Sequence, residues 1–374
     1  MEEEVAISAN QKTVVMVSAV NYPNLGGTET HVFETSKRLA QRGYNVINLT
    51  TDSGGTLSKH ETVENIEILR FPAYPSRPDL YYSPALIKTI RTLKSDIIHI
   101  QGVHTLIAPM AIKAAKSINA PVVLTFHSGG HSSFLRNHFR SIQYNAIKKR
   151  LRQVDKLVGV SNFEARFFSK YVGAKEITVI PNGADHLNIG IDMSNQRPNS
   201  GSPKLITVGR LEKYKGQRKV IKLLPHLIKD FPNIHLYVVG RGPDLDFLTR
   251  LTNDLKLTEH VTFTSFNPSE RHLLTALIKD SDAFLLLSDY EAHPVAVIEA
   301  VSLGVPAVVL NDTGLSDLVS DGFATAVEKY MTHSQIATIV ASTIKNSQPI
   351  SKDFKMPTWN DAVNELDKLY NNIS

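Results

Sequence analysis

Short runs of apolar residues alternate with longer amphipathic segments along most of the chain. The runs have the length of strands and are apolar at consecutive positions, which is typical of strands buried on both faces of a parallel sheet. In the first half of the chain they predict strands at 13–20, 45–51, 66–71, 96–101, 122–127, 157–161 and 177–181. In the second half they predict strands at 205–208, 236–239, 261–266, 283–287 and 307–310. Helical patterns such as 85–94 and 106–118 lie between them, so the sequence predicts an α/β fold with doubly wound parallel sheets.

This alternation is interrupted at residues 185–203. The segment has no apolar periodicity and is rich in serine, asparagine and proline, as linkers are. The 374 residues of the chain also exceed what one typical core contains. The predicted organisation is a Rossmann-like first domain at 1–187, a linker at 188–203, a Rossmann-like second domain at 204–350 and a terminal segment at 351–374. That last segment contains an amphipathic helix beginning at Trp359.

Composition and charge narrow the function without identifying it. With 42% hydrophobic and 21% charged residues the chain has the make-up of a globular protein, and its net charge of +5 suits an anionic ligand. No segment interleaves aromatic and basic residues, so nucleic acid is not an expected partner. The chain has no cysteine, which excludes disulfides and suits the cytoplasm. It also has no apolar run of about 18 residues and no signal-peptide pattern, so we expect no membrane span.

The strand predicted at 283–287 precedes the most specific pattern of the chain. A polar turn follows it, and then a helix for which a proline suits the first position. Such a start leaves the amides of Val295 and Ala296 free at the helix N-terminus, where a phosphate binds favourably. Glu291 and Glu299 flank this helix end, at the carboxyl edge of the sheet where open α/β folds bind ligands. Two glutamates on a solvated helix face are the simpler alternative.

Other predicted strands end in glycines and cations at the same edge. The glycines leave room for a ligand to approach the backbone: Gly26, Gly27, Gly240 and Gly242. Their spacing is not that of a dinucleotide fold, and a plain tight turn is the alternative for the first pair. Arg210 and Lys215 follow the first strand of the second domain, where two cations can reach one pyrophosphate from different sides.

Two sequence patterns contain residue types that can bind a metal ion, but another role explains each of them better. His127 and His131 are separated by two glycines, and no nearby carboxylate completes a zinc set. Asp244 and Asp246 open an apolar-periodic helix, where acids stabilise the N-terminus. We therefore predict no metal site. His127 is either an active-site residue or a structural histidine, and the sequence pattern does not decide between the two.

Residues 136–156 are strongly basic, with Asp155 as the single acid. Apolar residues at helical spacing make the segment amphipathic, so it suits an anionic membrane surface or a charged acceptor. A solvated helix face is the simpler interpretation.

Taken together and in this order, these segments resemble the retaining nucleotide-sugar glycosyltransferases of family 4 over nearly the full chain. The matching segments are Gly26-Gly27-Thr28-Glu29, His127, residues 180–185 (IPNGAD), residues 209–211 with 215–216, residues 240–243 (GRGP) and the Glu291…Glu299 pair. The pair is similar to that family's Glu-x7-Glu motif. The resemblance implies the GT-B architecture, with two Rossmann-like domains facing a cleft and a terminal helix that crosses back to the first domain.

The resemblance also implies roles for individual residues. His127 would bind the donor sugar, Arg210 and Lys215 would neutralise the pyrophosphate, Glu291 would bind the transferred sugar, and Glu299 the ribose. The other donor contacts implied are Gly26, Gly27, Asn182, Gly240, Gly242, His293, Val295 and Ala296. The leaving phosphate would assist a same-face attack, so neither a second carboxylate nor a cofactor or metal is required. The chain departs from the family at 292–294 (AHP), where glycine–aromatic–glycine is usual, and at 311–317.

The predicted function is therefore transfer of a sugar from a nucleoside diphosphate sugar to a hydroxyl of a glycan, glycolipid or polysaccharide precursor. A nucleotide-sugar epimerase shares the architecture, and a non-catalytic nucleotide-sugar-binding module is a third interpretation. We expect a cytoplasmic protein, with the segment 136–156 as a contact to the inner face of a membrane and to a lipid-linked acceptor.

Overall fold

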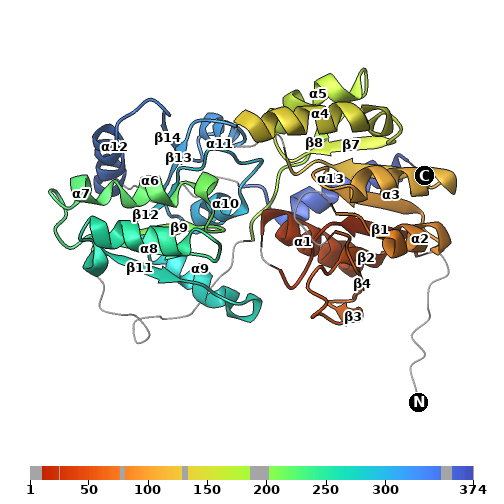
Figure 1. Cartoon of the computed structure of the whole chain (residues 1–374), viewed down its shortest axis with the longest axis horizontal. Coiled ribbons are helices and arrows are strands. Elements are labelled where there is room, and N and C mark those ends of the chain that lie inside the picture. The colour runs from red at the N-terminus through yellow and green to blue at the C-terminus, as the bar shows by residue number, and fades with distance from the viewer. Residues whose placement is uncertain are drawn as a thin grey trace, which may run out of the picture.

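The computed structural model describes residues 11–24, 26–75, 81–128, 134–185, 202–346 and 356–373, with the backbone alone for 134–140. Nearly all of the predicted linker, 188–203, lies outside these ranges, and so does His131. The described chain forms two sheets covered by helices, which confirms the predicted α/β class with doubly wound sheets (Figure 1).

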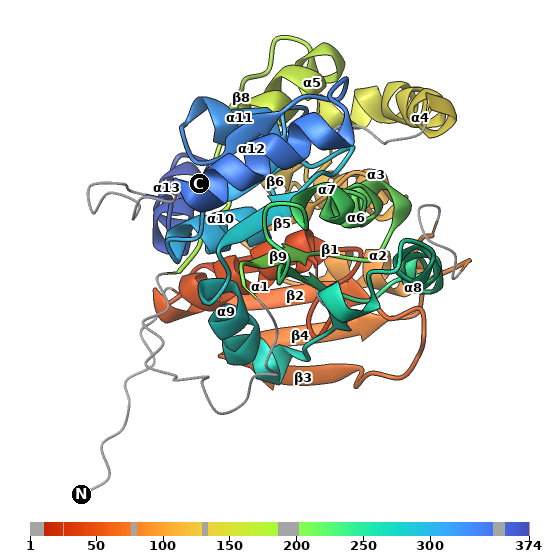
Figure 2. The same cartoon turned by 90° about the vertical axis from the view of Figure 1, so that its left-hand side faces the viewer.

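The first sheet contains the strands of the first half of the chain. They are β1 (Thr13–Ser18), β2 (Asn45–Thr51), β3 (His60–Val63), β4 (Ile66–Phe71), β5 (Ile97–Gln101), β6 (Val122–Thr125), β7 (Lys156–Gly159) and β8 (Ile177–Val179). Their order is β3-β4-β2-β1-β5-β6-β7-β8, and all neighbours are parallel except β3 and β4. Figure 2 shows β1, β2, β4 and β3 lying side by side in that order.

The second sheet is parallel throughout. Its strands are β9 (Lys204–Val208), β10 (His235–Val239), β11 (Val261–Thr264), β12 (Ala283–Leu286), β13 (Ala307–Leu310) and β14 (Thr325–Val327), in the order β11-β10-β9-β12-β13-β14. In both sheets the chain starts centrally, runs to one side and then continues on the other side of its first strand. The direction therefore reverses between β1 and β5 and between β9 and β12, and such reversals are where doubly wound folds bind ligands.

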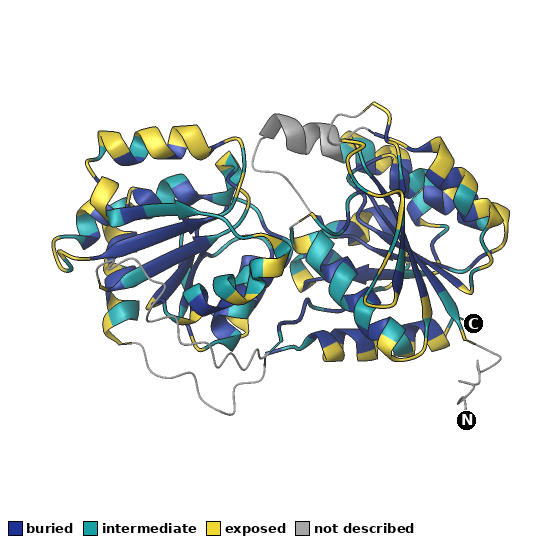
Figure 3. Ribbon diagram, turned by 90° about the horizontal axis from the view of Figure 1, so that it is seen from below, coloured by how far each residue is buried: buried dark blue, intermediate teal, exposed yellow. Residues whose placement is uncertain are grey.

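Helices cover both sheets. The first domain has α1 (Gly27–Gln41), α2 (Pro84–Thr92), α3 (Ile107–Ser117), α4 (Phe134–Leu151) and α5 (Asn162–Val172). The later helices are α6 (Gln217–Ile221), α7 (Leu224–Leu227), α8 (Leu245–Asp254), α9 (Arg271–Lys279), α10 (Val295–Ser302), α11 (Leu315–Ser320), α12 (His333–Lys345) and α13 (Trp359–Asn371), with short 3₁₀ turns at Lys213–Lys215, Thr258–His260 and Pro268–Glu270. Figure 3 shows the strands as a buried layer between helices whose outer faces are exposed.

The sequence pattern missed two strands and misplaced several element ends, two of which bear on the candidate site. β3 is an exposed, polar edge strand and β14 has three residues, so neither gives an apolar run. The strand predicted at 122–127 ends at Thr125, because the chain turns where His127 adopts a φ of 53°. Helix α10 begins at Val295, with Pro294 as its extended N-cap at ψ 109°, one residue later than predicted.

Helix α13 follows α12 in the chain but lies on the first domain beside α1 (Figure 1). Its buried residues Trp359, Val363 and Tyr370 join the core formed by β1 and α1. The helix is capped by Thr358 and Asp361, which bond to each other's backbone amides.

The two domains also contact each other directly. The Phe163 N–H at the start of α5 donates to Asp317 Oδ2 of α11 at 3.1 Å, and Arg166 Nη2 lies 3.6 Å from Asp317 Oδ1. A carboxylate of the second domain thus caps a helix N-terminus of the first, where negative charge is favoured.

Candidate active site

Lys215 and Glu291 form an ion pair at the reversal point of the second sheet. The Lys215 Nζ and Glu291 Oε1 atoms are 2.7 Å apart, with 18% and 9% of the two side chains exposed. Gly216, at φ +79°, makes this possible, because a Cβ there would lie 2.1 Å from the Leu287 carbonyl oxygen and would push the turn away from β12. Burial lowers the pKa of Lys215, but Glu291 and Tyr214 outweigh it and the net shift is upward. Lys215 is therefore a fixed cation.

Arg210 lies at the end of β9 beside this pair. Its Nη2 atom is 3.2 Å from Glu212 Oε1, and 60% of the side chain is exposed. Glu29, on α1 of the first domain, interacts electrostatically with both Arg210 and Lys215. Burial raises the pKa of Glu29, and the two cations oppose that shift. The Glu29 carboxylate folds back over Gly26, where a Cβ would lie 2.2 Å from its Oε2 atom.

Glu29 is a residue of this site to which sequence reasoning assigned no role. Its signal is present in the sequence, as an acid in the first helical turn directly after the glycine pair. Without the structure nothing indicates that it faces cations of the other domain.

His127 follows β6 and is held as a neutral imidazole. Its Nε2 atom is 2.7 Å from Gln101 Oε1, and its ring lies edge-on to His31 at 4.5 Å between centroids. Gln101 Nε2 points to Met16 Sδ at 3.5 Å, so Gln101 Oε1 is the acceptor and His127 Nε2 carries the proton. Burial lowers the pKa of His127 well below its ordinary value. His127 Nδ1 is therefore a hydrogen-bond acceptor.

Glu164 of α5 supports the loop that carries His127. This fully buried carboxylate accepts a hydrogen bond from the Ser128 N–H and another from the Val160 N–H at 2.8 Å. It thereby stabilises the turn at which His127 adopts its left-handed φ of 53°. Glu164 was not predicted, because an acid in the first turn of a helix is common.

Burial raises the pKa of Glu164 to about 8, and hydrogen bonds from the backbone oppose the shift. A carboxyl whose pKa is higher in the folded than in the unfolded chain stabilises the fold at low pH and loses that contribution as pH rises. Between its ordinary value of 4.5 and about 8, we expect the wild-type melting temperature to fall relative to that of Glu164→Gln. Calorimetry of both proteins across this range checks the prediction, and a pH-independent difference would contradict it.

Asn182 and His293 join the two domains. Asn182 Oδ1 accepts from His31 Nδ1 at 2.8 Å, and Asn182 Nδ2 donates to the His293 carbonyl oxygen at 2.7 Å. The Asn182 N–H also donates to His293 Nδ1 at 3.2 Å. Burial lowers the pKa of His293 to about 4, which keeps it neutral. These two predicted donor contacts thus bind each other, and the contact between His31 and His127 links them to the His127 loop.

Helix α10 begins directly after this bridge. Pro294 is its N-cap, and among the described residues the amides of Val295 and Ala296 find no acceptor. Glu299 lies one turn further and forms an ion pair with Arg271 of α9. Burial raises the pKa of Glu299, and Arg271 lowers it.

Gly240 and Gly242 are required by contacts within the chain. A Cβ at Gly240 would lie 2.0 Å from the Gly209 carbonyl oxygen, and one at Gly242 would lie 2.4 Å from the Leu211 carbonyl oxygen. The sequence pattern predicts room for a ligand at both glycines. The loop after β9, which carries Arg210, lies where side chains at these positions would be, and approach of a ligand to their backbone stays a prediction.

The aspartates considered for metal binding are engaged elsewhere. Asp244 forms a two-pronged ion pair with Arg218, whose Nε atom lies 2.7 Å from Asp244 Oδ2. Asp246 occupies the first turn of α8. Within the described parts of the chain, no group of three or more potential ligands is placed to hold a metal ion.

The basic segment 136–156 forms most of α4 and the turn after it. Side chains up to residue 140 lie outside the description, while Lys149 and Arg152 are exposed and Ile142 is 55% exposed. None of the helices described is both long enough and apolar enough to cross a bilayer.

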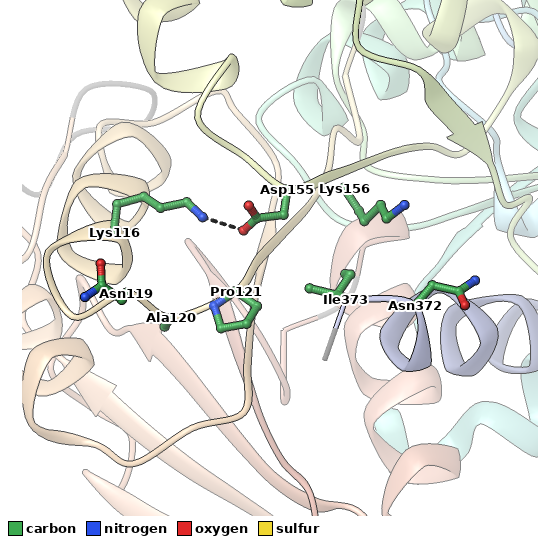
Figure 4. A pocket seen from close by; sticks show the side chains of 8 residues that line it. All are labelled: Lys116, Asn119, Ala120, Pro121, Asp155, Lys156, Asn372 and Ile373. Carbon is green, nitrogen blue, oxygen red and sulfur yellow. Dashed lines mark hydrogen bonds and ion pairs between the residues drawn. The ribbon is translucent and has the colours of Figure 1, made fainter.

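A pocket at the opposite edge of the first sheet is unrelated to these residues (Figure 4). It lies where β6 and β7 begin, between Pro121, the Lys116–Asp155 ion pair and Ile373 after α13. Ligands of doubly wound sheets bind at the other, carboxyl edge.

Two protein-family models match the chain. The model described as Glycosyltransferase Family 4 matches residues 25–186, and the model described as Glycosyl transferases group 1 matches residues 189–356.

Individual relatives cover most of the chain. The glycogen synthase of Mycobacterium tuberculosis is 29% identical over 346 residues, which are 83% of this chain and 80% of the relative. A phosphatidylinositol N-acetylglucosaminyltransferase polypeptide of Arabidopsis thaliana is 22% identical over 370 residues, covering 96% and 81%. The structure of sucrose-phosphate synthase from Thermosynechococcus elongatus matches with a TM-score of 0.78 and 18% identity, over 97% of this chain and 99% of that one. This similarity confirms the predicted GT-B architecture.

Proposed function

Because the chain belongs to the family 4 glycosyltransferases, we propose that it transfers a sugar from a nucleoside diphosphate sugar to a hydroxyl group, with retention of configuration at the transferred carbon. The acceptor in this proposal is a glycan, a glycolipid or a polysaccharide precursor.

The observation that carries the proposal is that charged side chains from both domains interact at the carboxyl edges of the two sheets. Arg210 and Lys215 come from the second domain, and Glu29 of the first domain interacts electrostatically with both of them. The ion pair between Lys215 and Glu291 is held at 2.7 Å in a largely buried position. Two fixed cations beside an open helix N-terminus suit a pyrophosphate.

In the proposed reaction Arg210 and Lys215 bind the pyrophosphate of the donor. Negative charge grows on the leaving phosphate as the glycosidic bond breaks, and these preorganised cations stabilise it. Glu291 binds hydroxyls of the transferred sugar, and His127 accepts a hydrogen bond from another sugar hydroxyl through Nδ1. The acceptor hydroxyl attacks from the side of the leaving phosphate and gives its proton to a phosphate oxygen. The two cations supply the charge that a metal supplies in other transferases, so we propose a metal-independent reaction.

The remaining donor contacts are proposed around this centre. The amides of Val295 and Ala296, for which the described residues provide no acceptor, and the backbone at Gly26 and Gly27 suit phosphate or sugar oxygens. Asn182 acts by holding His293, and Gly240 and Gly242 act by holding the Arg210 loop.

Glu299 is proposed to accept hydrogen bonds from the ribose hydroxyls of the donor. Replacing it by alanine should raise the donor KM by ~10-fold or more, since a hydrogen bond to a charged group contributes about 1.5–3 kcal/mol. Steady-state kinetics with varied donor concentration measures this change. A donor KM within about two-fold of wild type would rule out the ribose assignment.

A lipid-linked acceptor at an anionic membrane surface is supported by the basic segment 136–156 and the exposed Ile142 of α4. The name of the Arabidopsis relative describes sugar transfer to phosphatidylinositol, a lipid acceptor. The proposed location is the cytoplasmic side of that membrane.

The test of the proposed function is a thermal-shift screen against UDP, GDP, ADP and their sugars, with and without a chelator. Stabilisation by one nucleotide that the chelator does not change is the expected result. An assay of free nucleotide then separates the classes, because a transferase releases it only when an acceptor is present. Epimerisation of the donor, or binding without turnover over a wide acceptor range, would overturn the proposal.

A further inference from the structure

The carboxylate proposed to bind ribose is bound to an arginine of a neighbouring helix. Arg271, at the start of α9, donates through Nη2 to Glu299 Oε1 of α10. The two side chains are 36% and 19% exposed, so the carboxylate is more deeply buried than the guanidinium.

The positive charge of Arg271 counteracts the groups around Glu299 that raise the pKa of this carboxyl. Burial raises the pKa of Glu299, and the carboxylates of Glu34 on α1 and Asp185 after β8 raise it further. Arg271 opposes all three effects. Glu34 and Asp185 are themselves paired with Arg38 of α1. The ionised form of Glu299 therefore depends on Arg271.

The Arg271–Glu299 pair presents both kinds of hydrogen-bonding group. A carboxylate only accepts and a guanidinium only donates, whereas a hydroxyl group does both. Arg271 uses one N–H on Glu299, and its remaining N–H groups bond to no side chain among the residues described. A hydroxyl placed against the pair can give its proton to Glu299 and accept from Arg271 at the same time.

We propose that Arg271 is a nucleotide-binding residue that, together with Glu299, holds a ribose hydroxyl of the sugar donor. This inference rests on the proposed function, and it adds to it a residue outside the family pattern matched above. Arg271 keeps the carboxylate ionised and aimed, and donates to the hydroxyl oxygen.

Calorimetric titration of the full chain with UDP, GDP and ADP, and with the 2′-deoxy and 3′-deoxy forms of the nucleotide that binds, tests the proposal. We expect wild type to bind the ribonucleotide ~10-fold more tightly than at least one deoxy form. In Arg271→Met that preference should fall to about three-fold or less, with the donor KM raised and kcat little changed. Arg271→Lys, which keeps the charge without the planar fork, should be intermediate. Arg250→Met is the matched control, an exposed arginine on α8 of the same domain.

The pH dependence separates the two actions of Arg271. Without it, Glu34 and Asp185 raise the pKa of Glu299 unopposed, so nucleotide affinity of Arg271→Met should fall more steeply than that of wild type as pH is lowered. If Arg271→Met still binds the nucleotide more weakly than wild type at high pH, where Glu299 is ionised in both proteins, the remaining difference measures the direct hydrogen bond from Arg271.

Three outcomes would overturn the inference. An unchanged preference for ribose in a folded Arg271→Met protein would show that Arg271 is structural. Tighter binding by that variant would show that Arg271 competes with ribose for Glu299. If wild type binds none of the three nucleotides, the proposed function itself fails, and the inference fails with it.

Discussion

Replacing Lys215 by methionine should lower kcat for sugar transfer by ~100-fold or more. The ammonium group is held 2.7 Å from Glu291 and faces the site proposed for the pyrophosphate, so it is preorganised for the charge that develops on the leaving phosphate. Removing one such group from an active site costs about 2.7–4 kcal/mol of transition-state stabilisation. Methionine keeps an unbranched apolar side chain of similar length. Nucleotide release in the presence of acceptor, measured at saturating donor, gives the change in kcat.

The control for this variant is Lys213→Met, two residues earlier in the same 3₁₀ turn but exposed. It should have wild-type kinetics. Loss of Lys215 leaves the buried Glu291 carboxylate unpaired, which also lowers stability, so the melting temperature must be measured and assays run well below it. Lys215→Arg, which keeps the charge, should retain more activity than Lys215→Met. A folded Lys215→Met protein with normal kcat would remove Lys215 from the mechanism.

Most of the fold follows from local patterns in the sequence. The runs at 45–51, 66–71 and 307–310 coincide with β2, β4 and β13. β13 is apolar and buried at every position, as a strand buried on both faces is, whereas β4 alternates buried and partly exposed residues. Strands at the edge of a sheet do not show this apolar pattern. β3 pairs on one side with β4 and carries polar residues, so its sequence resembles a loop. The end of β6 also escapes it, since the turn at His127 depends on Glu164, which lies 37 residues further along the chain.

The site was predictable as a set of residue types and not as a set of contacts. Lys215 was expected at the pyrophosphate and Glu291 at the transferred sugar, yet their mutual ion pair depends on how closely the turn after β9 packs on β12. Residues whose partners lie in the other domain, such as Glu29, carry no local signal of that partnership. The same holds for Asn182. Its amide side chain is of a type that often contacts ligands, but here it forms hydrogen bonds with His31 and His293.

Gly240 shows that one glycine can be explained in two ways. It was attributed to ligand approach, which stays a prediction, and the structure adds that a Cβ there would collide with the Gly209 carbonyl oxygen. A glycine at a strand end indicates close approach by some group, and only the packing of neighbouring loops decides whether that group is a ligand or the chain itself.

Among the glycines that the structure describes, Gly314 has the closest such contact, and it lies in the segment that departs from the family pattern. A Cβ at Gly314 would lie 1.7 Å from the Ala292 carbonyl oxygen and 2.9 Å from that of Glu291. The same loop holds Glu291 in place, because the Gly314 N–H donates to the Glu291 carbonyl oxygen at 2.9 Å and the Thr313 hydroxyl accepts from the Glu291 N–H at 3.0 Å. Any side chain at 314 must therefore separate the loop after β13 from the loop that carries Glu291.

Gly314→Ala should consequently reduce kcat by ~100-fold, because a displacement of about 1 Å in groups that position the substrate has an effect of that size. Gly322→Ala is the matched control. Its φ of +76° disfavours alanine by about 1–2 kcal/mol, but no atom lies within 4 Å of the added Cβ, so stability should fall and kcat should not. Kinetics and melting curves of both variants separate displacement from strain. If Gly314→Ala lowers only the melting temperature and leaves kcat at the wild-type value, then the exact position of Glu291 does not matter for transfer. The assignment of Glu291 to the transferred sugar would then be wrong.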